Sequence, residues 1–251
     1  MVATVVGWQL FQLTQDSFSI GIAGLSEFVP VFALALYAGH VIDRSDKRTL
    51  LLKGILGYAA CVAGLIVITL PTFENKFSVA TLSILFYAII FCTGAIRAFA
   101  GPTSNAIIAQ LVPKDILQYA ANISSTTWLS ASIFGHASAG FLIHLAGVNG
   151  TFWIILLYVV LAAFALSKIE KKPIMHTKVG VKTWDSMREG LSYVFRNKIL
   201  LAAISLDLFA VLFGGAVALI PEFATKILQV GSIGFGWLNA AVDIGSVIMI
   251  I

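Results

Sequence analysis

The sequence has 251 residues, of which 59% are hydrophobic and 11% are charged, and its formal net charge is +4. Soluble domains carry about 25% charged residues, so this composition excludes a water-soluble fold. The mean hydropathy of +0.96 instead indicates an all-α integral membrane protein.

Apolar runs long enough to cross a membrane predict seven spanning helices, preceded by a shorter apolar stretch at residues 1–13. The runs are residues 19–42, 49–70, 79–111, 120–146, 151–166, 199–221 and 233–251. The third run is too long for one straight helix, and Pro102 within it predicts a kink, because proline removes a backbone hydrogen bond.

The basic residues orient these helices, because loops rich in lysine and arginine stay on the cytoplasmic side. Alternate loops place 13 of the 16 basic residues on one side, Lys76 and Lys226 on the other, and Arg97 inside a helix. The net positive charge is therefore a topology signal and a contact with membrane lipids. No nucleic-acid partner is expected.

The longest polar interruption covers residues 168–198. An apolar stripe at helical spacing runs through it, made of Trp184, Met187, Leu191, Val194 and Phe195. This stripe predicts an amphipathic helix that lies on the cytoplasmic face of the membrane. An ordinary helical linker is the alternative.

An internal repeat suggests two related bundles. "SIGIAGL" at residues 19–25 returns as "SIGFGWL" at 232–238, with four of seven residues identical at an offset of 213. Transporters built from parallel repeats show such a pattern. With this offset, the first helix would begin before Met1, and the second copy would stop before its own charged loop. We therefore expect a fragment truncated at both ends, from a partial helix 1 through helix 8.

Three regions follow from this division. Residues 1–167 would form an N-terminal bundle with part of helix 1 and helices 2–6. Residues 168–198 would form the cytoplasmic linker, and residues 199–251 would begin a C-terminal bundle with helices 7 and 8.

The charged turn within "AGHVIDRSDKR", residues 38–48, separates two apolar runs. Its characteristic residues are Gly39, Asp43, Arg44, Lys47 and Arg48. A glycine permits close helix packing at a short loop, a carboxylate can meet a facing helix N-terminus, and the basic residues can pair with carboxylates or anionic lipids. A basic anchor that only sets topology is the alternative reading.

This pattern resembles motif A of the major facilitator superfamily, although Asp46 replaces the usual second glycine. "GWQLFQLTQDSFSIG", "GAIRAFAGPTSNAIIAQLVPKD" and "DLFAVLFGGAVALIPEFA" are similar to the branch of drug and siderophore exporters of the enterobactin-exporter type. The resemblance implies two pseudo-repeated six-helix bundles. It also implies that the turn latches the bundles together in an outward-open state.

The stretch "SIFGHASAG" resembles the Gly-Pro-x-x-Gly-Gly motif of antiporters in this superfamily. Gly135 and Gly140 are retained, while His136 and Ala139 replace a proline and a glycine. Small residues at this spacing allow close helix packing. For His136, a packed and hydrogen-bonded role is favoured over that of a proton carrier.

Four ionisable residues lie inside predicted spans, and each is a functional candidate because a charge in the membrane is costly. They are Glu27, Arg97, Asp207 and Asp243, with Gln9 and Asn239 as further polar candidates of a proton or substrate pathway. Arg97 matches the superfamily's fourth-helix arginine, which the resemblance links to proton coupling. A structural pair with Asp43 or Glu27 is its alternative role, and Asp207 is the candidate proton carrier.

The resulting hypothesis is a secondary transporter, a monomer in the bacterial inner membrane, that exports small amphiphilic molecules such as drugs or siderophore-like compounds by proton coupling. An importer of small solutes and a non-transporting sensor or scaffold are the alternatives. An enzyme is not expected, because no nucleophile, metal or nucleotide-binding motif is found. No cofactor or metal site is expected either. Cys61 and Cys92 are two thiols in apolar runs.

Overall fold

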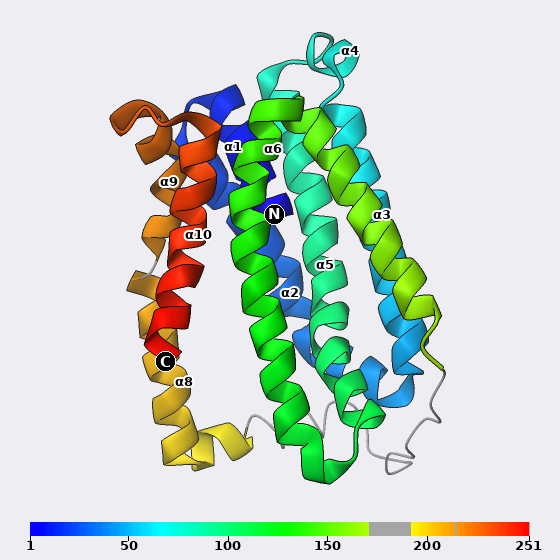
Figure 1. The fold of residues 1–251 in the computed structure, drawn as a ribbon. Helices are drawn as coiled ribbons and strands as arrows, with labels where there is room; N and C mark the ends of the chain where they lie inside the picture. Colours follow the sequence, from blue (N-terminus) through cyan, green and yellow to red (C-terminus); the bar gives the residue numbers. More distant parts are fainter. Residues whose placement is uncertain (171–191, 214, 251) are drawn as a thin grey trace.

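A computed structural model of the chain describes residues 1–170, 192–213 and 215–250. In this part of the chain the elements are helices (Figure 1). They are α1 (Val2–Thr14), α2 (Ser17–Arg44), α3 (Lys47–Ile68), α4 (Pro71–Glu74), α5 (Val79–Leu111), η1 (Lys114–Ile116), α6 (Leu117–Ser167), α8 (Lys198–Phe213), η2 (Gly215–Leu219), α9 (Ile220–Glu222), η3 (Phe223–Ile227) and α10 (Gly231–Ile250). Four of them, α2, α3, α5 and α6, are long and apolar enough to cross a membrane.

The 51-residue α6 contains two of the predicted helices. Gly147 interrupts it with φ 69° and ψ 177°, a backbone conformation that glycine adopts without a steric penalty. The chain reverses direction there, so the two parts of α6 run antiparallel (Figure 1). We call residues 117–146 the first arm of α6 and residues 148–167 its second arm.

Short polar residues mark where the long helices begin. Asp16 accepts a hydrogen bond from the Phe18 backbone N–H at the start of α2, and Asp46 accepts one from Arg48 at the start of α3. Ser78 does the same for Thr81 at the start of α5. These side chains satisfy N–H groups that have no partner inside the helix. Helix α5 stays helical through Pro102.

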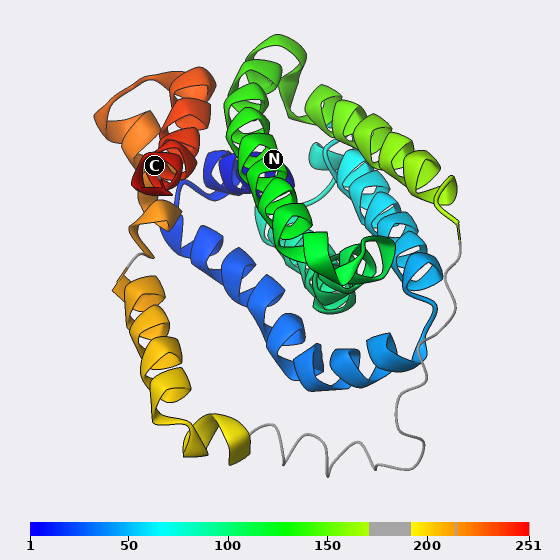
Figure 2. The same cartoon turned by 60° about the horizontal axis from the view of Figure 1, so that its bottom comes forward.

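The long helices α2, α3, α5, α6 and α10 pack together, and α1 lies between α2 and α6. Helix α2 lies along α5, α3 lies between α5 and α6, and α10 lies along α6 (Figures 1 and 2). Val5, Leu10 and Phe11 of α1 are fully buried. Large apolar side chains such as Phe32 and Phe134 are 72% and 74% exposed, which suits a surface that lipid covers.

The two ends of the assembly differ in the loops that they carry. The α2–α3 turn, the α5–α6 turn, the end of α6 and the start of α8 lie at one end, and the α1–α2 turn, α4 and the η3–α10 turn lie at the other (Figure 1). Successive loops thus alternate between the two ends, as the distribution of basic residues predicted. Following the orientation that the basic residues predict, we call the first the cytoplasmic end and the second the outer end. Of the predicted amphipathic stripe, Trp184, Met187 and Leu191 lie outside the described residues.

Candidate functional site

An ion pair joins α2 and α5. The Arg97 guanidinium donates to the Glu27 carboxylate. The two helices come close because Gly94, three residues before Arg97, has no side chain. A Cβ on Gly94 would overlap the Glu27 carbonyl oxygen and would stand 2.8 Å from Pro30 Cγ. The glycine therefore places Glu27 within reach of Arg97, the pairing that the sequence left open.

Arg97 also lines a pocket of about 480 Å³ between α5 and the first arm of α6. The arginine side chain is 60% exposed, whereas that of Glu27 is 26% exposed. The other lining residues are Gly101, Ser104, Asn105, Ser124, Ser125, Trp128 and Leu129. The wall thus combines a cation, hydroxyl and amide groups, and an indole ring.

Two further pockets are described. One of about 640 Å³ lies along the first arm of α6, beside Asn122, Thr126 and Ser130. Another of about 700 Å³ lies at residues 192–199, where none of the candidate residues is found. Of these three pockets in the described part of the chain, the Arg97 pocket is the one lined by a charged residue that the sequence placed inside a span, so we take it as the candidate binding site.

A second polar cluster joins α1, the first arm of α6 and α10. The Ser132 hydroxyl donates to Asp243 Oδ2 at 2.6 Å, and His136 Nε2 lies 3.8 Å from the same oxygen. On the other side of the ring, His136 Nδ1 is 2.7 Å from Thr4 Oγ1. The expectation that His136 is hydrogen-bonded is confirmed. We call Thr4, Ser132, His136 and Asp243 the interface cluster.

Glycines bring α6 and α10 together beside this cluster. A Cβ on Gly140 would overlap the Ser232 carbonyl oxygen and would stand 2.9 Å from the Gly236 Cα. Ala139 is fully buried at the same crossing. Gly140 is one of the small residues that the sequence predicted to pack closely. Its partner Gly236 was missed, although the spacing of glycines in "GSIGFGW" was a visible signal. A Cβ on Gly135 would reach Met1 only at 3.7 Å, an ordinary contact.

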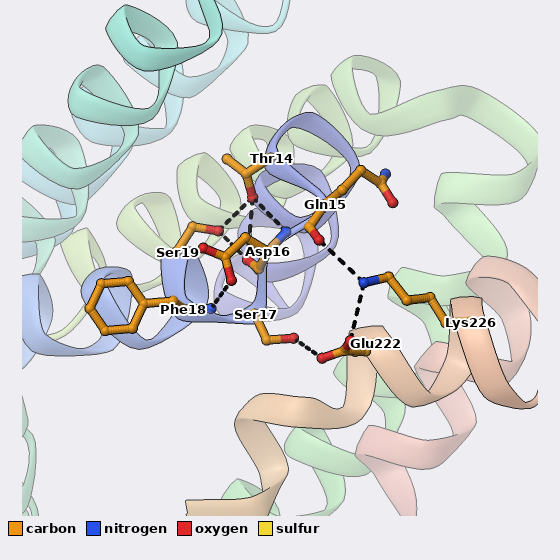
Figure 3. A network of polar contacts seen from close by, with 8 residues as sticks. All are labelled: Thr14, Gln15, Asp16, Ser17, Phe18, Ser19, Glu222 and Lys226. Atoms are coloured by element: carbon orange, nitrogen blue, oxygen red, sulfur yellow. Dashed lines mark hydrogen bonds and ion pairs between the residues drawn. The ribbon is translucent and has the colours of Figure 1, made fainter.

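At the outer end, the α1–α2 turn binds the segment that precedes α10 (Figure 3). Ser17 Oγ donates to Glu222 Oε2 at 2.6 Å, and Lys226 Nζ donates to Glu222 Oε1 at 3.1 Å and to the Gln15 carbonyl at 3.3 Å. The Ser17 hydroxyl, and then the Lys226 ammonium, lower the pKa of Glu222. We call these four residues the outer clasp. Their roles were missed by the sequence reading.

The charged turn between α2 and α3 lies at the cytoplasmic end. Arg48 Nη2 donates to the Ser167 carbonyl at 2.5 Å, which ties the start of α3 to the end of α6. Asp43 and Arg44 are exposed in the last turn of α2, and Lys47 begins α3. Within the described residues, a Cβ on Gly39 would meet no atom within 4 Å, so the close packing expected there is not seen among them. The helices approach closely at Gly94 and Gly140 instead.

The remaining candidates lie apart from these clusters. Asp207 is exposed on α8, at the edge of the assembly (Figure 2). Gln9 Nε2 donates to Glu74 Oε1 at 2.6 Å at the outer end, where burial raises the pKa of Glu74. Asn239 Nδ2 donates to the Phe235 carbonyl of its own helix at 2.9 Å. The structure thus pairs Glu27 with Arg97 and Asp243 with His136. Asp207, Gln9 and Asn239 lie apart from both pairs.

Among the described residues, no group of three or more His, Cys, Asp or Glu side chains could hold a metal ion. Cys61 and Cys92 are free thiols.

Comparison with known proteins identifies relatives. A family model described as "Major Facilitator Superfamily" matches residues 1–251. The chain is 25% identical over 264 residues to "Uncharacterized MFS-type transporter YfiS" of Bacillus subtilis (strain 168), covering 96% of this chain and 58% of that protein. It is 24% identical over 218 residues to "Uncharacterized MFS-type transporter YkuC" of the same organism, covering 82% and 48%. The chain thus spans about half the length of these relatives.

Proposed function

Because the chain belongs to the major facilitator superfamily, a family of membrane transporters rather than enzymes, we propose that it exports small amphiphilic molecules in exchange for protons. The proposal includes a location in a bacterial inner membrane, in line with the bacterial relatives. The activity of the whole protein belongs to the proposal, since the chain spans about half of each relative.

The observation that carries this proposal is the Glu27–Arg97 pair at the wall of the Arg97 pocket. A guanidinium binds carboxylate or phosphate groups through two parallel hydrogen bonds. Trp128, 68% exposed, offers an apolar ring on the other wall of the pocket. A molecule with one anionic or strongly polar group and one planar apolar part would satisfy both walls.

The same pair supplies a means of coupling. Arg97 stays protonated, whereas Glu27 can take up a proton. An ionised Glu27 can accept a hydrogen bond or a positive charge from the polar group of a substrate. A proton bound at Glu27 removes that negative charge and weakens the hold on the substrate. Proton and substrate would thus compete for Glu27 and bind in alternation, which is the requirement for exchange.

The two ends of the molecule support alternating access. The outer clasp ties the α1–α2 turn to the segment before α10 at the outer end. The Arg97 pocket lies between the cytoplasmic halves of α5 and α6. We propose that this is a form closed to the outside. The turn with Gly39, Asp43, Arg44, Lys47 and Arg48 would hold the cytoplasmic end when the clasp opens.

The test is Glu27→Gln in everted membrane vesicles, in the chain together with any flanking sequence that its gene encodes. Glutamine keeps a hydrogen bond to Arg97 but cannot exchange a proton. We expect dye transport driven by a pH gradient to fall at least about tenfold, the change that about 1.4 kcal/mol of lost coupling produces. Substrate exchange without a gradient should persist.

Two matched variants complete the test. Glu74→Gln removes a carboxylate at the outer end, and gradient-driven transport should stay at the wild-type rate. Asp207→Asn tests the rival carrier on α8. Wild-type transport by Glu27→Gln together with a loss in Asp207→Asn would move the coupling site from α2 to α8 and refute the role given to Glu27.

A further inference from the structure

The interface cluster has a geometry that suits a bound proton. His136 Nδ1 faces the Thr4 hydroxyl at 2.7 Å, and Nε2 faces the Asp243 carboxylate at 3.8 Å. A histidine ring that carries both protons has two donors and no acceptor. Each donor would then point to an oxygen. The carboxylate also receives the Ser132 hydroxyl at 2.6 Å, so the charged form of each partner is supported by a neighbour.

Among the described residues, the charged side chain beside the His136 ring is the Asp243 carboxylate of α10. This carboxylate favours an imidazolium, whereas burial of the ring opposes one. The carboxylate is therefore the group on which proton binding at His136 depends.

The cluster is half-buried rather than sealed. The side chains of His136 and Asp243 are 24% and 19% exposed. Part of each side chain is therefore accessible, while most of it lies against protein. Because a net charge in the membrane is costly, the pair is easier to bury when it is neutral overall, as imidazolium with carboxylate.

The position of the cluster links it to the contact between the two parts of the chain. His136 lies one helical turn from Gly140 on α6, and Asp243 lies two turns from Gly236 on α10. At these glycines the two backbones touch. A change in the attraction between His136 and Asp243 would therefore act on the same helix crossing, on the side away from the outer end.

We propose that His136 and Asp243 form a proton-binding site between the first bundle and α10. One proton from water binds at His136 Nε2 and changes the summed charge of the two side chains from −1 to 0. The same proton returns to water when it leaves. The bound proton holds α10 on α6 beside the glycine crossing, and its loss loosens that hold. This site is separate from the Glu27–Arg97 pair and requires no substrate.

Histidine resonances of the purified chain test the site directly. The sequence has four histidines, so selective ¹⁵N-histidine labelling in detergent micelles yields few signals, each assigned by a single substitution. His136 should titrate in the wild type, and Asp243→Asn should displace its titration midpoint by about one pH unit, as expected for the removal of an adjacent charge. Ser132→Ala should displace it by less.

His144 on the same arm of α6 is the internal control. Its titration should be the same in the wild type and in Asp243→Asn, which would also show that the variant keeps its fold. An unchanged midpoint of His136 in Asp243→Asn would overturn the proposal, and so would a His136 ring that does not titrate between about pH 5 and pH 8, the range in which histidine changes charge. The NMR titration does not depend on transport. It therefore tests this site even if the proposed exchange of substrate for protons is wrong.

Discussion

Two helix crossings are built from similar kinds of residue at different places in the assembly. At the α2–α5 crossing, Gly94 lies against the Glu27 carbonyl, and the Glu27–Arg97 pair follows one turn away. At the α6–α10 crossing, Gly140 lies against Gly236, and the His136–Asp243 pair follows at a similar distance along α6. Each crossing thus combines backbone contact at a glycine with a carboxylate that lies beside a basic side chain.

The difference lies in the cation and in what the crossing joins. Arginine stays charged at every accessible pH, whereas histidine changes charge near neutrality. The first crossing joins two helices of residues 1–167, and the second joins those residues to α10. In the proposed transport cycle, the pair that contains histidine would therefore lie where the two parts of the chain move against each other.

The largest expected effect comes from filling the glycine contacts. Gly94→Ala and Gly140→Ala each place a methyl group against backbone atoms, which cannot rotate away. We expect each to lower the free energy of unfolding by about 2 kcal/mol or more, measured by thermal unfolding in micelles. Hydrogen exchange over α10 should rise in Gly140→Ala and stay unchanged in Gly94→Ala.

The matched controls for these variants are on the same helices. A Cβ at Gly101 of α5 meets no atom within 4 Å, and one at Gly135 of α6 makes an ordinary contact at 3.7 Å. Gly101→Ala and Gly135→Ala should be neutral or stabilising by up to about 1 kcal/mol, because alanine favours a helix. If Gly140→Ala were as well tolerated as Gly135→Ala, the close crossing of α6 and α10 would be wrong.

A smaller effect is expected from the charged pairs, measured by double-mutant cycles. For Glu27 and Arg97 the coupling should be about 1 kcal/mol, because Arg97 is 60% exposed and water screens the pair. This coupling should weaken as the pH falls, because the proposed exchange requires Glu27 to take up a proton. The coupling of His136 with Asp243 should be present at about pH 6 and weaker at pH 8. Equal pH dependence of both cycles would remove the distinction between the crossings.

Local features of the fold could be predicted from the sequence. Apolar runs indicated the long helices, and the "GVNG" stretch at residues 147–150 separated the two helices that meet at Gly147. These features depend on neighbours in the chain. The pairing of Glu27 with Arg97, 70 residues apart, was foreseen only as one of two alternatives, because an intramembrane charge demands a partner without specifying which one.

Contacts between distant segments could not be predicted in the same way. Ser17 and Glu222 are 205 residues apart, and Ser132 and Asp243 are 111 apart. No periodicity encodes which turn of α6 meets which turn of α10. Gly39 shows the opposite case, in which a sequence motif suggested a contact that is not seen among the described residues. The tight contacts are at Gly94 and Gly140, where helices cross deep inside the assembly rather than at a loop.

The outer clasp offers the smallest expected effect, and it extends the comparison to a contact outside the membrane. The Ser17 hydroxyl and the Lys226 ammonium hold the pKa of Glu222 below its ordinary value when the clasp is closed. A group whose pKa is lowered in one state stabilises that state above the ordinary pKa, and this stabilisation is lost as the pH falls through the lowered value. The clasp should therefore be closed at neutral pH and should open only on the acid side, below about pH 4.

Spin labels on the two sides of the clasp measure this directly. Phe18→Cys and Leu228→Cys, both at exposed positions, are introduced after Cys61→Ser and Cys92→Ser. The distance distribution between the labels should be unchanged from about pH 8 to pH 5 and should broaden below about pH 4, near the ordinary pKa of glutamate. In Glu222→Gln it should be equally broad at every pH, because the amide cannot ionise, whereas Lys226→Met should broaden it less, since the Ser17 hydrogen bond remains. Broadening near pH 6 instead would mean that the His136–Asp243 pair, and not Glu222, controls the outer end, and the two pH-sensitive contacts would then act as one.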